Sequence, residues 1–446
     1  MSLQVIGVGG YNEVGKNMTL VKYNDEIVIL DMGFYLPSLV DFEEQGGDRK
    51  NLTVKGLQKL GAIPDDSALS SFKNNVKAIV PSHCHLDHVG AIPYLEKNYN
   101  TKIIGTPYTI EVLNTLAEDE NLRLKNPVIV NKAGSTVEVS KNIKVEFIGT
   151  THSTLDVVNV AIHTPEGIVL YTNDFKFDNN PVIGKKPDYD RLRELGKQGK
   201  VRAILLDSLY SNQPMKTPSE NVAREMLKDV MFGADNEGHA MIMTTFASQI
   251  ARLKSMVEFG KKLDRDIVFL GRSLAKYTKA AINTGYGGFM SDVEIVTYAR
   301  QVERKLKQIE KDRDKYLVVC TGNQAEPGSI LTRIGSKKLP FKFVHDDHII
   351  FSCKTIPVSP NIENRQKLEK QFMKEGVRIF KDIHVSGHGA REDARDMIDL
   401  VKPEIIIPSH GDVAHIGGIT ELTEVLGYKT GKTLQFLANG KTIDLK

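Results

Sequence analysis

Short apolar runs that end in a histidine or an aspartate recur along the chain. They have the length and the β-branched content of buried strands, and they are residues 76–80, 145–149, 167–171 and 404–407. The polar groups that follow them are His83, His152, Asp174 and His410. Because a strand ends at the edge of its sheet, we expect these groups at sheet edges, where α/β proteins build their sites.

The middle of the chain follows a different pattern, in which apolar runs alternate with helix-length segments. The expected strands are 202–208, 239–245, 266–270, 315–320 and 347–352. The expected helices are one that opens at Thr217–Glu220 with a capping box, then 248–263, 273–283 and 298–311. This alternation predicts a parallel sheet with helical crossovers, and therefore a second α/β domain between Asp174 and His410.

The heptapeptide SHCHLDH at residues 82–88 concentrates three histidines and a carboxylate, which no hydrophobic core requires. At strand or loop spacing His83 and His85 can face one metal ion. Asp87 and His88, on the following turn, can reach a second ion about 3.5–4 Å away. The pattern HxHxDH therefore predicts a two-metal hydrolytic site.

The order HCHLDH, His152, Asp174 and His410 resembles the ligand order of the metallo-β-lactamase fold, an αββα sandwich. The resemblance implies two zinc ions per chain, with Mn²⁺ as the alternative metal. It implies that one ion is held by His83, His85 and His152, and the other by Asp87, His88 and His410, with Asp174 bridging them. Such ions lower the pKa of bound water from about 15.7 to near 7, which permits hydrolysis at neutral pH.

The inserted domain resembles the β-CASP domain of nucleic-acid-processing members of this superfamily. Asp207 matches motif A, His388 in SGHG matches motif B, and His410 in PSHGD matches motif C. These spellings, with the opening GVGGYNEVGKN at 7–17, resemble ribonuclease J, and the short segment after motif C resembles its archaeal form. The expected domains are 1–207 and 382–446 for the metallo-β-lactamase fold and 208–381 for the β-CASP insert.

Two segments depart from the family pattern. Ala325 stands in TGNQAE where relatives have glycine, and KTIPVS at 354–359 replaces a serine-rich loop. Both concern the expected RNA channel, and neither contains a proposed metal ligand. The glycine-rich stretch 7–15 lacks the GxGxxG order and a following helix, so we expect a hairpin or substrate-side loop there and no dinucleotide site.

The resemblance implies a ribonuclease that acts in RNA decay and processing, as a 5′-to-3′ exonuclease with some endonuclease activity. Asp87 would orient the attacking water. His388 would contact the scissile phosphate or protonate the leaving 3′ oxygen, held by Asp207. The alternatives are a β-CASP endonuclease of RNA 3′-end maturation and, from another class, a catalytically silent RNA-binding scaffold. The size of the insert disfavours a small-molecule hydrolase.

The expected partner is single-stranded RNA, preferably with a 5′-monophosphate end. An exonuclease must hold one terminal nucleotide between an anchor and the metals, and hydroxyl and backbone N–H donors suit a terminal phosphate. The residues expected to bind this end are Ser386, Gly387, His388 and Arg272. A homodimer is expected as well.

Composition fits an enzyme with two ordinary cores, since 41% of the 446 residues are hydrophobic and 26% are charged. The net charge of +3 gives no global basic signature, so RNA must be bound locally. The candidate contacts are Arg252, Lys254, Lys261, Lys262, Arg265, Arg272, Arg333, Lys337 and Lys338. Three cysteines suggest no disulfide framework, and no signal or membrane segment is apparent, so we expect a cytoplasmic protein without a membrane partner.

Overall fold

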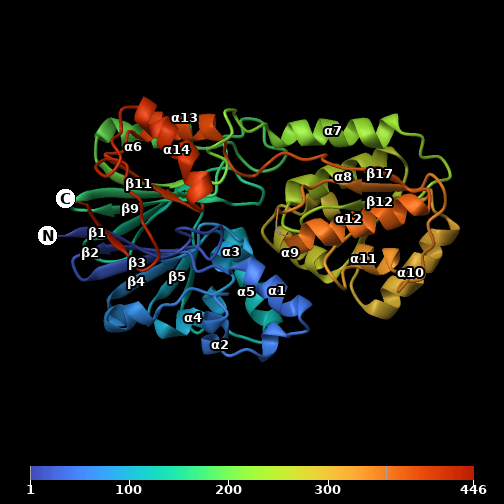
Figure 1. The fold of residues 1–446 in the computed structure, drawn as a ribbon, viewed down its shortest axis with the longest axis horizontal. Helices are drawn as coiled ribbons and strands as arrows, with labels where there is room; N and C mark the ends of the chain where they lie inside the picture. The colour runs from blue at the N-terminus through green and yellow to red at the C-terminus, as the bar shows by residue number, and fades with distance from the viewer. Residues whose placement is uncertain (1, 358, 446) are drawn as a thin grey trace. The chain divides into compact units, whose positions relative to one another are not determined.

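The chain divides into two compact units. The computed structural model describes residues 2–357 and 359–445, so Val358 of the 354–359 segment lies outside the described residues. One unit contains residues up to 179, 184–217 and 386 onward, and the other contains 180–183 and 218–385 (Figure 1). The domain boundaries predicted after 207 and 381 stay a prediction.

The first unit contains two sheets. The seven-stranded sheet has the order β19-β1-β2-β3-β4-β5-β6, and the six-stranded sheet has the order β18-β11-β10-β9-β8-β7. The strands of the first sheet are β1 (Leu3–Gly9), β2 (Met18–Tyr23), β3 (Glu26–Leu30), β4 (Val76–Val80), β5 (Lys102–Gly105), β6 (Val128–Val130) and β19 (Thr442–Leu445). Those of the second are β7 (Thr136–Glu138), β8 (Lys144–Gly149), β9 (Val158–Thr164), β10 (Gly167–Asn173), β11 (Val201–Asp207) and β18 (Ile405–Ser409).

Both sheets of this unit are covered on both faces. Alternate residues of each sheet meet in one shared core, for example Val28 and Val80 from the first sheet with Phe147 and Val169 from the second. The outer face of the first sheet packs against α1 (Leu36–Glu44), α2 (Val54–Lys59), α3 (Leu86–Val89), α4 (Ile92–Leu95) and α5 (Pro107–Asp119). That of the second packs against α6 (Tyr189–Gln198), α13 (Arg391–Val401) and α14 (Val413–Val425). The αββα sandwich is confirmed.

The glycine-rich segment 7–15 forms the end of β1 and most of the connection to the antiparallel strand β2. At Gly9 a Cβ atom would lie 2.0 Å from the carbonyl oxygen of Lys16, so only glycine fits where the two arms of the hairpin approach. The same loop pairs with Gly411, next to His410, through isolated bridges from Tyr11 and Glu13. The expected hairpin is therefore present, and it borders one of the predicted site residues.

The second unit is built on one sheet with the order β14-β13-β15-β12-β16-β17, whose strand pairs are all parallel. Its strands are β12 (Met241–Thr244), β13 (Asp266–Leu270), β14 (Val293–Val296), β15 (Tyr316–Cys320), β16 (His348–Phe351) and β17 (Arg378–Phe380). Its helices are α7 (Glu220–Gly233), α8 (Ile250–Lys262), α9 (Arg272–Asn283), α10 (Ala299–Lys311), α11 (Ile330–Gly335) and α12 (Ser359–Lys374). The predicted parallel sheet with helical crossovers is confirmed, but the strand expected at 202–208 is β11, which pairs with β10 and β18 in the first unit. β14, β17, α11 and α12 were not predicted.

The start of α7 differs from the predicted capping box. Ser219 is the N-cap, and its hydroxyl accepts a hydrogen bond from the backbone N–H of Asn221. The hydroxyl of Thr217 instead donates to the carbonyl oxygen of His388 at 2.8 Å. The prediction that Thr217 opens the helix is wrong, because this side chain stabilises the loop of motif B.

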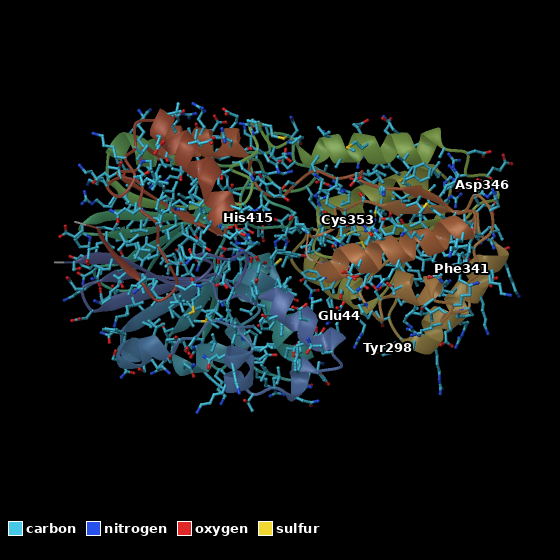
Figure 2. The ribbon with its side chains drawn as sticks, viewed as in Figure 1. Glu44, Tyr298, Phe341, Asp346, Cys353 and His415 are labelled. Atoms are coloured by element: carbon cyan, nitrogen blue, oxygen red, sulfur yellow. The ribbon has the colours of Figure 1, made fainter. Side chains whose placement is uncertain are left out.

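The three cysteines are buried free thiols. Cys353, labelled in Figure 2, has its sulfur 3.7 Å from the carbonyl oxygen of Asn323, and burial raises the pKa of its thiol to about 11. Burial likewise raises the pKa of Cys84 to about 12. Thiols held in this way are protonated at neutral pH and unreactive. Among the described residues, no helix is both long enough and apolar enough to cross a membrane.

Two of the nine cations predicted to contact RNA are internal to the second unit. Arg252 is fully buried, and its guanidinium bonds both oxygens of Glu220 at 2.6 and 3.0 Å, as well as Ser352. Arg265 is 5% exposed and donates to carbonyl oxygens, including that of Tyr316. The prediction that these two arginines bind RNA is wrong, because each is buried and its guanidinium is bonded to acceptors inside the unit.

We expect Arg252→Ala to lower the unfolding free energy of the second unit by about 3–5 kcal/mol, because it leaves Glu220 buried without its cation. The measurement is urea unfolding followed by circular dichroism. Lys262→Ala, on the exposed face of the same helix α8, is the matched control and should change stability by less than about 1 kcal/mol. Equal decreases in unfolding free energy in both variants would show that the buried Arg252–Glu220 pair stabilises the unit no more than an exposed lysine does.

Candidate metal centre

Parallel strands bring the predicted groups to one edge of the second sheet. β10, β11 and β18 are adjacent and parallel, and they lead to Asp174, Asp207 and His410 respectively. β8 has the same direction as β10, since β9 lies between them and is antiparallel to both, so His152 follows β8 at the same edge. The segment 82–88 follows β4 of the facing sheet. The apolar runs predicted that these side chains would lie at a sheet edge, and the strands place them there.

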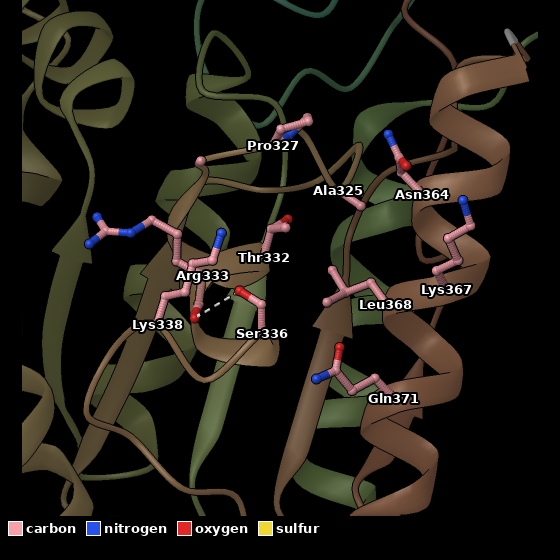
Figure 3. Close-up of a pocket in the computed structure, with 11 residues that line it drawn as sticks. Ala325, Pro327, Thr332, Arg333, Ser336, Lys338, Asn364, Lys367, Leu368 and Gln371 are labelled. Atoms are coloured by element: carbon pink, nitrogen blue, oxygen red, sulfur yellow. Dashed lines mark hydrogen bonds between the residues drawn. The ribbon is translucent and has the colours of Figure 1, made fainter. Parts of the chain in front are cut away.

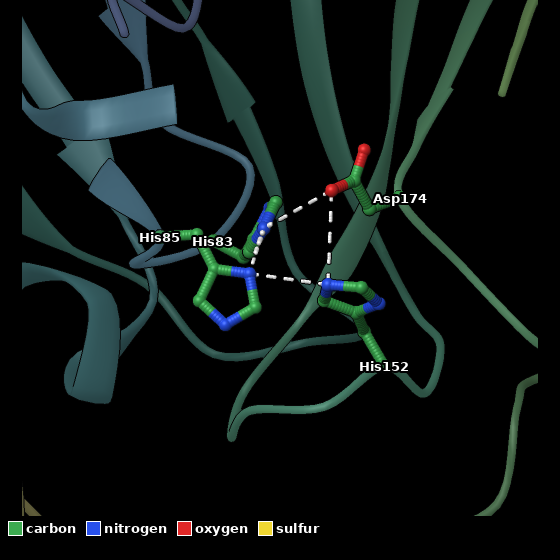
Figure 4. A group of neighbouring side chains, drawn as sticks. All are labelled: His83, His85, His152 and Asp174. Carbon is green, nitrogen blue, oxygen red and sulfur yellow. Dashed lines mark hydrogen bonds and ion pairs between the residues drawn. The ribbon is translucent and has the colours of Figure 1, made fainter. Parts of the chain in front are cut away.

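The side chains form two four-membered groups that share Asp174. In the first, His83, His85, His152 and Asp174 offer ligand atoms that all lie within 4.8 Å of one another (Figure 4). In the second, the same holds for Asp87, His88, Asp174 and His410. The Oδ2 atom of Asp174 lies 3.7 Å from Nε2 of His83 and 3.2 Å from Nε2 of His88. One carboxylate thus faces both groups.

Hydrogen bonds on the far side of two imidazole rings select the tautomer that leaves Nε2 as an electron donor. Nδ1 of His152 donates to the carbonyl oxygen of Gly387 at 2.7 Å, and Nδ1 of His88 lies 2.7 Å from Oδ2 of Asp31. A carbonyl oxygen can only accept, so the proton of His152 is on Nδ1. Metal-binding histidines are commonly oriented by a partner of this kind.

The electrostatics of the two groups suit a cation. Burial lowers the pKa of His83 and His152 well below the usual value and that of His85 to about 4, so these rings are neutral. At His88 burial also favours the neutral ring, but Asp174, Asp87 and Asp31 raise its pKa well above the usual value. The neutral imidazoles of the first group beside the carboxylate of Asp174 are what a divalent ion requires, whereas His88 of the second group must lose a proton before its Nε2 can bind one.

Asp174 is the most constrained of these groups. It is 1% exposed, and its Oδ1 atom has no hydrogen-bond partner among the described residues. Burial alone would raise its pKa, but His410, His88 and His388 hold the pKa of this carboxyl well below its usual range. A buried, ionised oxygen without a donor costs several kcal/mol unless a cation lies beside it. This orphan oxygen is the observation that best fits a metal between the groups.

His388 and Asp207, together with Asp174, form a third group at the same edge. Nδ1 of His388 lies 2.8 Å from Oδ2 of Asp207, and Nε2 lies 3.7 Å from Oδ2 of Asp174. Burial favours the neutral ring, yet Asp174 and Asp207 raise the pKa of His388 to about 9. The imidazole is therefore protonated at neutral pH and points its Nε2–H toward the two groups.

The other residues predicted to bind the substrate lie in different places. Ser386 accepts a hydrogen bond from the backbone N–H of His388 at 2.9 Å. Gly387 packs so closely that a Cβ would lie 2.6 Å from Oγ of Ser153 and 2.8 Å from the ring of His152. Arg272 is exposed at the first residue of α9, in the second unit. Cys84, whose sulfur lies 3.1 Å from Oγ1 of Thr154, belongs to neither ligand group.

Sequence reasoning missed Asp31, Tyr171 and Asn17. Asp31 follows β3 and is fully buried, and it accepts hydrogen bonds from the backbone and hydroxyl of Ser82 and from Tyr171. The side chain of Asn17 lies 3.1 Å from Nε2 of His88 and 2.9 Å from Nδ1 of His410. Asp31 could have been found, because it ends an apolar run in the way Asp174 does. Asn17 carries no such signal.

Three family models match successive parts of this chain. They are the metallo-beta-lactamase superfamily at residues 11–203, the ribonuclease J beta-CASP domain at 238–367, and the Zn-dependent metallo-hydrolase RNA specificity domain at 377–430. Ribonuclease J of Methanocaldococcus jannaschii is 42% identical over 100% of this chain and 99% of its own length. The chain belongs to the ribonuclease J family. Its nuclease fold and its β-CASP insert, both expected from the motifs, are thereby confirmed.

Other relatives agree with this membership. Ribonuclease J of Pyrococcus abyssi is 41% identical over 99% of this chain and 97% of its own length, and ribonuclease J of Sinorhizobium meliloti is 30% identical over 99% and 74%. A crystal structure of a protein of unknown function from Enterococcus faecalis V583 covers 100% of both chains with a TM-score of 0.66. At 16% identity that likeness shows the fold alone.

We expect Asp31→Asn to weaken metal binding by about 10- to 100-fold, because the amide no longer holds Nδ1–H of His88 with a negative charge. The measurement is zinc retention in competition with a chromogenic chelator. Asp25→Asn, on the exposed turn just before β3, removes the same charge and should bind zinc as the unaltered chain does. Unchanged retention in Asp31→Asn would mean that this carboxylate serves packing alone.

Proposed function

We propose that this member of the ribonuclease J family hydrolyses RNA phosphodiester bonds at a centre of two zinc ions, with Mn²⁺ as the alternative. The first ion would be held by His83, His85 and His152, the second by Asp87, His88 and His410, and both by Asp174. The observation that carries the proposal is that two four-membered ligand groups share one buried carboxylate. The domain division into 1–207, 208–381 and 382–446 is part of the same proposal.

Bound ions would supply Lewis acidity and an activated water. The chain's own residues would do the rest. The carbonyl oxygen of Gly387 and the carboxylate of Asp31 fix the rings of His152 and His88, so these ligands need no rearrangement on binding. Asp87, which faces Nε2 of His88 at 3.4 Å, would also orient the water.

His388 would act as the acid of the reaction. Asp174 and Asp207 raise the pKa of His388 to about 9 in the metal-free chain, and Asp207 holds Nδ1 so that Nε2 faces the site. A group in this state can bond a phosphate oxygen or give its proton to the leaving 3′ oxygen. Asp207 would position His388 without touching the substrate.

The proposed direction of attack is 5′ to 3′, with endonuclease activity in addition, and the proposed substrate is single-stranded RNA in decay and processing. Relatives that share 41–42% of the sequence are named ribonuclease J, which supports the RNA substrate. The segment 386–388 would receive a 5′-monophosphate, because Gly387 lies beside His152 and Ser386 adds a hydroxyl group to the same loop. Arg272 would help by contacting phosphate. We also propose that the protein is cytoplasmic. A homodimer is proposed as well, and its test is the mass of the protein in solution.

Asp174→Ala should abolish hydrolysis and retain much of the RNA affinity, because it removes the carboxylate common to both ligand groups. Zinc content by mass spectrometry and cleavage of labelled RNA are the two measurements. Asp190→Ala, which removes an exposed carboxylate on α6, is the control and should keep both metals and full activity. Normal turnover of Asp174→Ala with metal lost would refute the two-metal centre.

Ser386→Ala should reduce the preference for 5′-monophosphate over 5′-hydroxyl RNA more than it reduces internal cleavage. Matched 5′-labelled and internally labelled substrates are resolved on gels, with Ser71→Ala, an exposed serine, as control. A single small product from the 5′ end indicates exonuclease action, and internal ladders indicate endonuclease action. An equal fall in all rates would leave Ser386 a structural residue and remove the proposed 5′ pocket.

A further inference from the structure

The second unit contains a cavity of about 450 Å³ between α11 and α12. One wall is the loop at residues 325–328, which follows β15 (Figure 3). Arg333 and Lys338 lie on the α11 side, and Asn364, Lys367 and Gln371 lie on α12. Cavities of about 300–1,000 Å³ are the size that small ligands occupy.

The charge of this cavity has one sign. Arg333, Lys338 and Lys367 line it, and none of its lining residues is an aspartate or glutamate. Within the described part of the chain, neither Arg333 nor Lys338 forms an ion pair, and Lys367 only approaches Glu363 at 4.0 Å. Cations close by are neutralised, since Lys337 pairs with Glu375 at 3.3 Å and Arg365 with Glu369 at 2.9 Å. The cations that line the cavity are therefore the ones left for an anion.

The position in the sheet also favours a ligand. β12 and β15 are neighbours in the centre of the sheet. From β12 the chain crosses over β15 to form β13, and from β15 it crosses over β12 to form β16. The connections from this central pair thus run in opposite directions, and parallel sheets bind ligands outside the carboxyl ends of such strands. The loop 325–328 leaves the carboxyl end of β15.

The remaining lining groups suit a nucleoside. Leu368 and Ala325, which are 4% and 2% exposed, belong to the buried core and form the apolar floor of the cavity, which one edge of a base can contact. The Nε2 atom of Gln371 donates to the carbonyl oxygen of Gly335, which fixes this amide at the cavity wall with its oxygen as an acceptor. A phosphate at the cationic side and a base at the α12 side would use both kinds of surface.

We propose that this cavity binds a nucleoside 5′-phosphate unit, with the phosphate held by Arg333 and Lys338. The unit is either one nucleotide of the RNA chain or the free mononucleotide that 5′-to-3′ hydrolysis releases. Both sources of the nucleotide assume the proposed ribonuclease function. The binding of a nucleoside 5′-phosphate to the cavity does not depend on it.

The binding test uses the full chain in EDTA, so that a metal-loaded centre does not contribute, and titrates AMP by calorimetry. Arg333→Ala should raise the dissociation constant roughly 10- to 100-fold, as expected when a charge-assisted bond to phosphate is lost. Lys370→Ala removes a neighbouring cation that is exposed on α12 and does not line the cavity, and it should change the constant less than about twofold. Arg333→Lys, which keeps the charge, should recover part of the affinity.

The second arm separates the two sources. Single-stranded RNA that carries 4-thiouridine is photo-crosslinked to the Asp174→Ala chain, with and without Arg333→Ala. Crosslinks to residues 325–338 or 364–371 that disappear with Arg333→Ala identify a nucleotide of the RNA. AMP binding that depends on Arg333 without such crosslinks identifies the free mononucleotide. If neither AMP nor RNA binding responds to Arg333, the proposal is overturned, whereas loss of cleavage alone counts only against the proposed function.

Discussion

One buried carboxylate determines how the catalytic unit is organised. Asp174 has one oxygen within 3.7 Å of ring nitrogens of His83, His88, His152 and His388, and the other 3.8 Å from Nδ1 of His410. Burying an ionised carboxyl is expensive unless opposite charge and hydrogen bonds compensate it. The surrounding strand ends supply imidazoles, and neutral imidazoles leave room for cations. The sandwich thus surrounds the buried charge of Asp174 with the groups that compensate it, and the same groups form the site.

The loop of motif B couples two tasks at that site. Its Gly387 carbonyl oxygen fixes the tautomer of His152, while His388, the next residue, carries the acidic Nε2–H. Thr217 secures the same loop by donating to the carbonyl oxygen of His388. A shift of this loop would therefore move the hydrogen-bond partner of His152 and the ring of His388 together. The backbone of the loop lies so close to these neighbours that a Cβ at Gly387 would meet Ser153 and His152.

The sequence predicts what depends on local pattern and misses what depends on partners far along the chain. β13 was predicted at its observed bounds, because an apolar run and its ends are local features. Asp31 was missed as the partner of His88, 57 residues away, although its own strand end was visible. α12 was missed because its segment is mostly polar, with few apolar positions to mark a face. Arg252 was misjudged for a similar reason, since nothing near it in sequence reveals that Glu220 lies against it.

That misjudgement changes how nucleic-acid recognition must work in the second unit. A net charge of +3 cannot hold a polyanion by its overall field, so individual cations matter. Three arginines bond to partners inside the unit. Arg252 and Arg265 bond to buried acceptors, and Arg365 pairs with Glu369. The arginines left without an ion pair among the described residues include Arg272, which follows the carboxyl end of β13, and Arg333, on the helix α11 that follows β15. Because β13 and β15 are adjacent and parallel, the segments that lead to these two cations both start at the carboxyl edge of one sheet, the edge at which parallel sheets bind ligands.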